Sequence, residues 1–253
     1  MTRLLLVDAT NVVMRCASIP DVEPQAAVQT ALGIVLRAVR VTRATHLVCA
    51  FDSPDESLRK RAYPEYKAGR TTKTSIWVDA ACAVFEMARV YCLAAPGYEA
   101  DDVIATIARR ATHAPVEILS SDSDLLVLAG GAVTVWQFDK TGDGGFAPRS
   151  PAWICQKYGI PTPSHLTLYK TLVGETSDNV PGVPKVGPVK ARRLIEEFDT
   201  LAMMRGLGVL GEHHAWAEQA YELIRLYDDA PVPIVDPRLA KVTLLIDDRR
   251  QSA

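Results

Sequence analysis

The sequence predicts an α/β fold in which a mostly parallel central sheet is flanked by helices. Short apolar runs at residues 4–7, 46–51 and 116–119 are typical of buried strands, and each run leads into an acidic residue. Helical periodicity lies between them, at residues 26–41 and from residue 99 onward. Because open α/β sheets place ligands at the carboxyl ends of their strands, the repeated acids favour a binding site at that edge.

Further elements continue this pattern along the first part of the chain. Residues 76–89 have helical periodicity, and the short apolar run at 90–93 that follows predicts a strand. Residues 133–138 predict another strand, and the glycine-containing stretch at 140–145 predicts a turn. We therefore expect residues 1–149 to form an α/β core.

From about residue 150 the pattern changes to helices, at residues 151–158 and 164–173. A stiff turn at 181–187 leads into a basic helix, with Pro188 suited to its first position. A helix that begins at such a turn presents backbone amides to a phosphate. We expect residues 150–253 to form a helical region packed on the core. The remaining expected elements are a helix around residues 215–227 and a strand at 242–246.

Size and composition predict an ordinary globular protein. The chain has 253 residues, 48% of them hydrophobic, and a net charge of −2. Its longest apolar runs are too short for a signal peptide or a membrane span, so we expect no membrane segment. The cysteines form no C-x-x-C pair, which predicts reduced thiols, a cytoplasmic location and no disulfide framework. They are Cys16, Cys49, Cys82, Cys92 and Cys155. We also expect a monomer.

Acidic residues gather at the predicted strand ends and at two other points of the chain. Acids in a first helical turn are also common as caps, but recurrence at several strand ends favours a cation site. Oxygen ligands suit Mg²⁺ or Mn²⁺, whereas zinc normally recruits His or Cys. Because Mg²⁺ needs only one or two protein carboxylates, this number of acids implies two or more ions. The candidate ligands are Asp8, Asp52, Glu99, Asp101, Asp102, Asp122, Asp124, Glu175 and Asp178.

This set of acids favours metal-dependent phosphodiester hydrolysis. Two ions about 4 Å apart serve nucleases and polymerases, and a polymerase would need a nucleotide-binding apparatus that is not evident here. The chain has no P-loop and no G-x-S-x-G elbow. Residues 57–73 hold six bases and two tyrosines, which suit a nucleic-acid surface, although a solvated charged loop is the alternative.

Six segments in a fixed order carry a resemblance to a known family. They are residues 5–8 (LLVD), 51–52 (FD), 63–70 (YPEYKAGR), 96–105 (PGYEADDVIA), 118–125 (ILSSDSDL) and 177–183 (SDNVPGV), followed by the turn before Ala191. With these motifs the sequence resembles the 5′-nucleases, which comprise flap endonucleases and the 5′→3′ exonuclease domain of bacterial family A DNA polymerases.

The resemblance implies a helical arch at about residues 53–95 and a helix-three-turn-helix at about 174–198 that grips duplex DNA. It implies that the acids named above are the metal ligands and that Lys67 and Arg70 touch the scissile phosphate. It places the two tyrosines at the base of the arch, near unpaired nucleotides. The implied DNA-binding residues are Tyr63, Tyr66, Lys185, Gly187, Lys190, Arg192 and Arg193.

The implied function is a stand-alone bacterial or phage 5′-nuclease that cleaves DNA at 5′ flaps, nicks or ends with Mg²⁺ or Mn²⁺. A DNA polymerase is a candidate partner that the sequence does not assign. One alternative is a ribonuclease of the related PIN-domain type, which would leave the duplex-gripping region unexplained. The other is a catalytically weak nucleic-acid-binding repair protein, against which the nearly complete set of acids argues.

Two positions depart from the family pattern. Glu175 stands where the family usually has Asp, so the second metal is expected to sit differently or bind more weakly. Lys185 stands where the hairpin usually has a glycine, which removes a residue tolerant of positive φ. The monovalent-cation site often formed there is therefore in doubt for this chain, and Lys185 could supply that charge at a phosphate.

Overall fold

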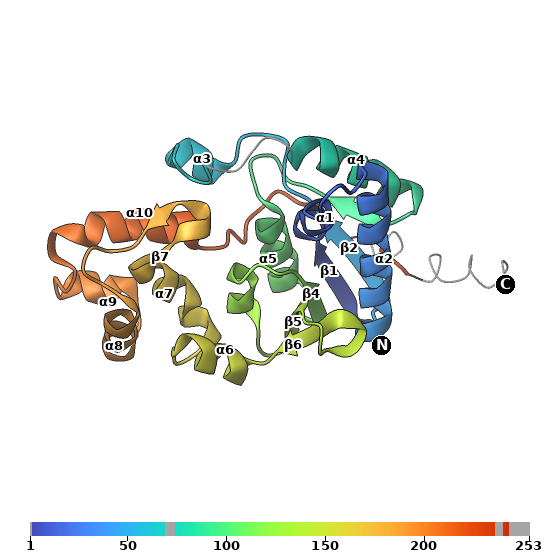
Figure 1. Ribbon diagram of the computed structural model, residues 1–253. Helices are drawn as coiled ribbons and strands as arrows, with labels where there is room; N and C mark the ends of the chain where they lie inside the picture. Colours follow the sequence, from blue (N-terminus) through green and yellow to red (C-terminus); the bar gives the residue numbers. More distant parts are fainter. Residues whose placement is uncertain (1, 69–73, 236–239, 243–253) are drawn as a thin grey trace.

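The centre of the protein is a six-stranded sheet with the order β3-β2-β1-β4-β5-β6 (Figure 1). The structure, a computed structural model, describes residues 2–68, 74–235 and 240–242. All neighbouring strands are parallel except β5 and β6. The strands are β1 (Leu4–Asp8), β2 (His46–Ala50), β3 (Tyr91–Leu93), β4 (Val116–Leu119), β5 (Val133–Phe138) and β6 (Phe146–Arg149).

The predicted mostly parallel α/β architecture is confirmed, with β6 as an addition. The stretch at 140–145 turns through the short 3₁₀ helix η2 (Asp143–Gly145), and Gly144 and Gly145 have positive φ values of 58° and 85°. The chain then returns antiparallel to β5. The sequence does not predict β6, because it contains Pro148, and proline in a short segment argues against a strand. Proline cannot donate a hydrogen bond to a neighbouring strand, so it is tolerated on an edge strand such as β6.

Helices cover both faces of the sheet, and β1 shows why. Its successive side chains point to opposite faces, so Leu5 and Val7 join one buried cluster while Leu4 and Leu6 join another. The first cluster lies under α1 (Ala9–Ala17), α2 (Pro24–Thr42) and α4 (Thr74–Met87), and the second lies under α5 (Ala100–Arg110). Two buried faces account for strands that are apolar throughout.

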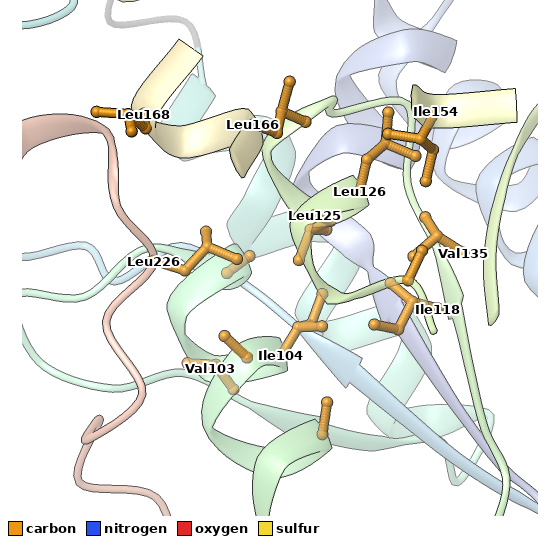
Figure 2. Close-up of a cluster of buried hydrophobic side chains, with 14 of the residues drawn as sticks. Val103, Ile104, Ile118, Leu125, Leu126, Val135, Ile154, Leu166, Leu168 and Leu226 are labelled. Atoms are coloured by element: carbon orange, nitrogen blue, oxygen red, sulfur yellow. The ribbon is translucent and has the colours of Figure 1, made fainter. Parts of the chain in front are cut away.

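The helical region follows the sheet in the chain and lies beside it (Figure 1). Leu166 and Leu168 of this region belong to the same cluster as Val103 and Ile104 of α5, and Figure 2 shows their side chains with Leu226 nearby. The α5 face of the sheet and the helical region therefore share one apolar cluster. The helices are α6 (Pro151–Tyr158), α7 (Leu166–Val173), α8 (Pro188–Phe198), α9 (Leu201–Gly206) and α10 (His214–Ile224).

The segment predicted as an arch contains α3 (Leu58–Ala62) and α4. Ser57 caps α3 by accepting a hydrogen bond from the amide of Lys60, and α4 packs against α1 and α2. Residues 69–73 lie outside the described residues.

The predicted last strand at 242–246 is described only at Val242, whose amide donates to the carbonyl of Thr45 at 3.0 Å. Within the described residues, no helix combines the length and the apolar character that crossing a bilayer requires.

Candidate metal centre

Three carboxylates meet where α5 begins and β4 ends. Oxygen atoms of Asp101, Asp122 and Asp124 lie within 4.8 Å of one another. Asp101 belongs to the first turn of α5, Asp122 lies in the loop after β4, and Asp124 begins the 3₁₀ helix η1 (Asp124–Leu128) that follows. This is the meeting of helix start and strand end that the sequence predicts.

One oxygen of the Asp101 carboxylate lacks the partner that a buried polar atom needs. Its Oδ1 atom is buried and accepts no hydrogen bond from the residues that the structure describes. Burial, followed by the neighbouring Asp102, raises the pKa of Asp101 well above its ordinary value. Leaving a buried charge unpaired is costly, and a cation would remove that cost. The oxygen-only donors of this cluster fit a hard divalent cation.

Asp8 and Asp52 extend the acidic edge across the neighbouring strands. Asp8 accepts hydrogen bonds from the amide of Asn11 at 2.9 Å and from the hydroxyl of Ser120 at 2.8 Å. Asp52 accepts from the amide of Ala100 at 2.8 Å. Burial and then the charge of Asp52 raise the pKa of Asp8 to about 7. Such mutual repulsion is what a bound cation relieves.

Lys170 of α7 connects this edge to Glu175. Its Nζ atom contacts the carboxylate of Asp124, lies 2.7 Å from Oε2 of Glu175 and donates to Ser123 at 2.8 Å. Burial alone would lower the pKa of Lys170, but Asp124 and Glu175 outweigh it and raise the pKa above its ordinary value. Sequence reasoning missed Lys170. The sequence does contain a signal for it: Lys170 follows Leu166 by four residues, so both lie on the same face of α7, which is the buried face, and a buried lysine needs acidic partners.

Lys67 lies beside two of the candidate ligands, and its contact with a scissile phosphate stays a prediction. Its Nζ atom is 2.8 Å from Oε2 of Glu99 and 3.8 Å from Oδ2 of Asp178. Burial would raise the pKa of Glu99, but Lys67 and Arg59 lower it below its ordinary value, so Glu99 is a carboxylate. The main chain is also fixed, because the Lys67 amide donates to the Asp178 carbonyl at 2.9 Å. This hydrogen bond joins the turn between α7 and α8 to the segment predicted as the arch.

Asp102 is the exception among the predicted ligands. It is fully buried, and both its oxygens bind the guanidinium of Arg59 at 2.7 Å. Oδ1 also accepts from the amide of Tyr227 at 2.8 Å, and Oδ2 from the amide of Glu99 at 3.1 Å. With four donors already on its two oxygens, Asp102 is bound to Arg59 in this structure, and its role as a metal ligand stays a prediction.

The two predicted tyrosines differ in environment. Tyr66 is only 2% exposed, so it offers no ring face for base stacking, and its hydroxyl donates instead to Glu99 and Asp178 at 3.1 Å each. Tyr63 is half-buried, with its ring 5.7 Å from that of Trp216. The predicted catalytic residue Arg70 lies outside the described residues.

The segment predicted as the helix-three-turn-helix, residues 174–198, contains a hairpin of β7 (Gly174–Glu175) and β8 (Val180–Pro181) followed by α8, and α7 directly precedes it. Gly174 has φ +91°, and a Cβ atom there would lie 2.5 Å from the amide nitrogen of Gly182. Only glycine fits that approach.

The basic residues of this turn differ in how freely they face solvent. Lys185 adopts φ 63°, the left-handed conformation that a glycine would accept more readily, and Gly187 is the N-cap of α8. Lys190 and Arg193 are exposed. Arg192 is half-buried, and its Nε donates to the carbonyl of Tyr158 at 2.7 Å.

Two family models match the chain. Residues 3–159 match the 5′-3′ exonuclease N-terminal resolvase-like domain, and residues 161–243 match the 5′-3′ exonuclease C-terminal SAM fold. The resemblance drawn from the sequence motifs is thus confirmed.

Curated relatives are of two lengths. The flap endonuclease Xni of Klebsiella pneumoniae is 33% identical over 207 residues, which cover 78% of each chain. DNA polymerase I of Bacillus caldotenax is 34% identical over 205 residues, which cover 75% of this chain and 23% of the polymerase. The matched region therefore spans about a quarter of the length of that polymerase.

Solved structures share the fold. The flap endonuclease of bacteriophage T5, co-crystallised with metal ions, gives a TM-score of 0.75 at 18% identity and covers 98% of this chain and 97% of its own. The same phage enzyme in a complex with DNA and metal ions gives a TM-score of 0.71 at 19% identity, with 88% and 89% coverage.

Proposed function

Because this chain belongs to the 5′-3′ exonuclease family, we propose that it is a structure-specific 5′-nuclease that hydrolyses DNA at 5′ flaps, nicks or ends. The observation that carries the proposal is the cluster of Asp101, Asp122 and Asp124, with a buried carboxylate oxygen that no described residue satisfies. A site built this way needs cations before it can bind a phosphate.

The residues that would hold two or more divalent cations form two groups. Mg²⁺ or Mn²⁺ suits them, and such ions activate water and stabilise both oxygens of an in-line phosphoryl displacement. Lys170 lies between the groups and binds one acid from each. The first group is Asp8, Asp52, Glu99, Asp101, Asp122 and Asp124, and the second is Glu175 and Asp178.

Lys67 is the described cation best placed to meet the scissile phosphate. It is partly exposed and is held beside Glu99 by its own main chain and side chain. A fixed cation stabilises the charge that develops on phosphate oxygens more than it stabilises the ground state. We propose the same task for Arg70, on the family resemblance alone.

The helical region, residues 150–253, is proposed to hold the duplex, while residues 1–149 together with Glu175 and Asp178 hold the cations. The exposed Lys185, Lys190 and Arg193 and the amides at the start of α8 provide phosphate contacts without reading sequence. In this arrangement Lys185 supplies the positive charge that a monovalent cation would otherwise bring.

The test is cleavage of an end-labelled 5′-flap duplex with Mg²⁺, with Mn²⁺ and with Ca²⁺, beside the same substrate in RNA. We expect DNA cleavage with the first two ions and DNA binding with little cleavage in Ca²⁺. Asp122→Ala should lose cleavage and keep DNA affinity, whereas Asp143→Ala, at an exposed acid, should behave as wild type. Preference for RNA would indicate the ribonuclease alternative, and binding without cleavage a binding protein.

A further inference from the structure

Arg59 is a buried cation at the junction of three chain segments. It lies on α3 with 2% of its surface exposed. Its Nη1 and Nη2 atoms bind the two oxygens of Asp102 on α5, and Nη1 also donates to Oε2 of Glu99 at 3.3 Å. Nε donates to the carbonyl of Leu223 at 2.9 Å, and Nη2 to that of Arg225 at 2.8 Å.

These contacts use every donor that the side chain has. A guanidinium carries five N–H groups in a rigid fork, one on Nε and two on each terminal nitrogen, and each has an acceptor here. The carbonyls of Leu223 and Arg225 are at the end of α10, where helix carbonyls lack partners and the dipole is negative. The ring of Tyr227 lies 4.6 Å below the guanidinium carbon. Arg59 therefore joins α3, α5 and the end of α10 at one point.

The joined segments carry the parts of the proposed machinery. The chain after α3 leads to Lys67, and the start of α5 bears Glu99 and Asp101. α10 packs on α7, which bears Lys170 and leads into the predicted helix-three-turn-helix. The contacts of Arg59 thus link the proposed duplex-holding region to the segments that bear the acids.

We propose that Arg59 is a positioning residue that determines which phosphodiester bond reaches the acids, and that Asp102 is its counter-ion and not a metal ligand. The first clause rests on the proposed nuclease function. The second concerns the protein alone, so it can be tested without DNA.

The counter-ion role is tested by a double-mutant cycle in Mn²⁺ affinity, measured by calorimetry without DNA. Replacing both members of a buried ion pair with apolar residues is often neutral for folding, so Arg59→Met is the background. In it, Asp102→Leu should change the dissociation constant for Mn²⁺ by less than about threefold, whereas Asp101→Asn should raise it at least about tenfold. An equal loss from both substitutions overturns the counter-ion role.

A second test of the counter-ion role compares the melting temperatures of the same variants in EDTA. Asp102→Leu alone strands the Arg59 charge and should lower the melting temperature, and adding Arg59→Met should restore most of the loss. Additive losses would mean that the two side chains do not act as a pair.

The positioning role is tested by mapping product lengths on a flap substrate with one fixed junction. Wild type should give one dominant product, while the Arg59→Met/Asp102→Leu protein should spread cleavage over neighbouring positions and cut more slowly at saturating DNA. The matched control removes an exposed ion pair between α5 and the chain after α10, Arg109→Met/Asp228→Leu, whose atoms lie 3.2 Å apart. Its products should match wild type.

An unchanged product pattern in the Arg59→Met/Asp102→Leu protein, with the wild type active, overturns the positioning role and leaves the nuclease function standing. If the wild type cleaves no DNA at all, the proposed function fails, while the Mn²⁺ and unfolding results still decide the role of Asp102.

Discussion

Asp101 and Asp102 are neighbours in the first turn of α5, yet they occupy opposite environments. Asp101 has a buried oxygen without a described partner and lies among other acids. Asp102 has four donors on its two oxygens and a buried cation beside it. The comparison separates two environments of a carboxylate: one lies among other acids, where a cation would relieve the repulsion, and the other is paired with a buried cation.

The largest expected effect is the loss of stability when Asp102, the carboxylate with four hydrogen-bond donors, is replaced. Asp102→Asn leaves Arg59 buried without a full counter-charge, so the free energy of unfolding should fall by about 3–5 kcal/mol. Urea unfolding in EDTA measures this. A loss below about 1 kcal/mol would show that water or another group replaces Asp102, and the contrast with Asp101 would fail.

Asp101→Asn should have the reverse profile. Removing a charge that has no partner should leave stability in EDTA unchanged or raised, while cleavage should fall at least about 10³-fold, the upper end of what one charge-stabilising group contributes. Single-turnover rates and unfolding curves from one preparation make the comparison. Asp143→Asn, an exposed acid, is the control for both.

A Lys67→Ala variant tests whether the basic side chains near α5 act only as structural partners of the acids. Lys67→Ala should cut the single-turnover rate at saturating DNA by about 10²–10³-fold, with a much smaller change in affinity. Full recovery of the rate at high enzyme concentration would instead make Lys67 a binding residue. Lys140→Ala, at an exposed site, is the matched control.

The stored repulsion should also appear as a pH dependence. The pKa of Asp8 rises from 3.8 to about 7 on folding, mainly through burial and then through Asp52. The pKa of Asp8 is higher in the folded than in the unfolded protein. Its contribution to the free energy of unfolding is therefore complete below pH 3.8 and is lost as the pH rises through about 7.

The melting temperature in EDTA should therefore decline over that range, and the stabilisation by added Mn²⁺ should grow. Asp8→Asn should flatten both trends. If the stabilisation by Mn²⁺ stayed constant across this pH range, Asp8 would not interact with the bound cation.

The smallest effects concern the outer surface of the proposed duplex-holding region. Lys190→Ala should reduce the slope of log K against log salt by roughly 0.9, the value of one phosphate contact. Arg192→Ala should reduce it less, because its Nε is already bound to Tyr158. Equal changes would show that Arg192 reaches phosphate despite that bond.

Much of the fold and part of the site follow from the sequence alone. The strands at residues 4–7, 46–51 and 116–119 form as predicted, and their acids meet because parallel strands end at one edge of a sheet. Helix signals are local too, so Pro188 starts α8 where predicted. The helix predicted at 215–227 ends earlier, at Ile224, where Arg59 binds the last carbonyls.

Other features depend on contacts between distant segments. β6 is recognisable only by its pairing with β5, and α1 only by the cap that Asp8 forms with the amide of Asn11. Tyr66 is predicted as a stacking surface but is buried under contacts from residues 33 and 112 positions away.

The sequence by itself determined that acids would gather at the start of α5, because apolar periodicity and strand ends are local patterns. It did not determine which of the two adjacent aspartates would face the cluster. That depends on Arg59 and Tyr227, which lie 43 and 125 residues from Asp102 in the chain. Only the tertiary structure brings their donors to one carboxylate and leaves the next one unsatisfied, because hydrogen-bond partners are set by packing and not by sequence spacing.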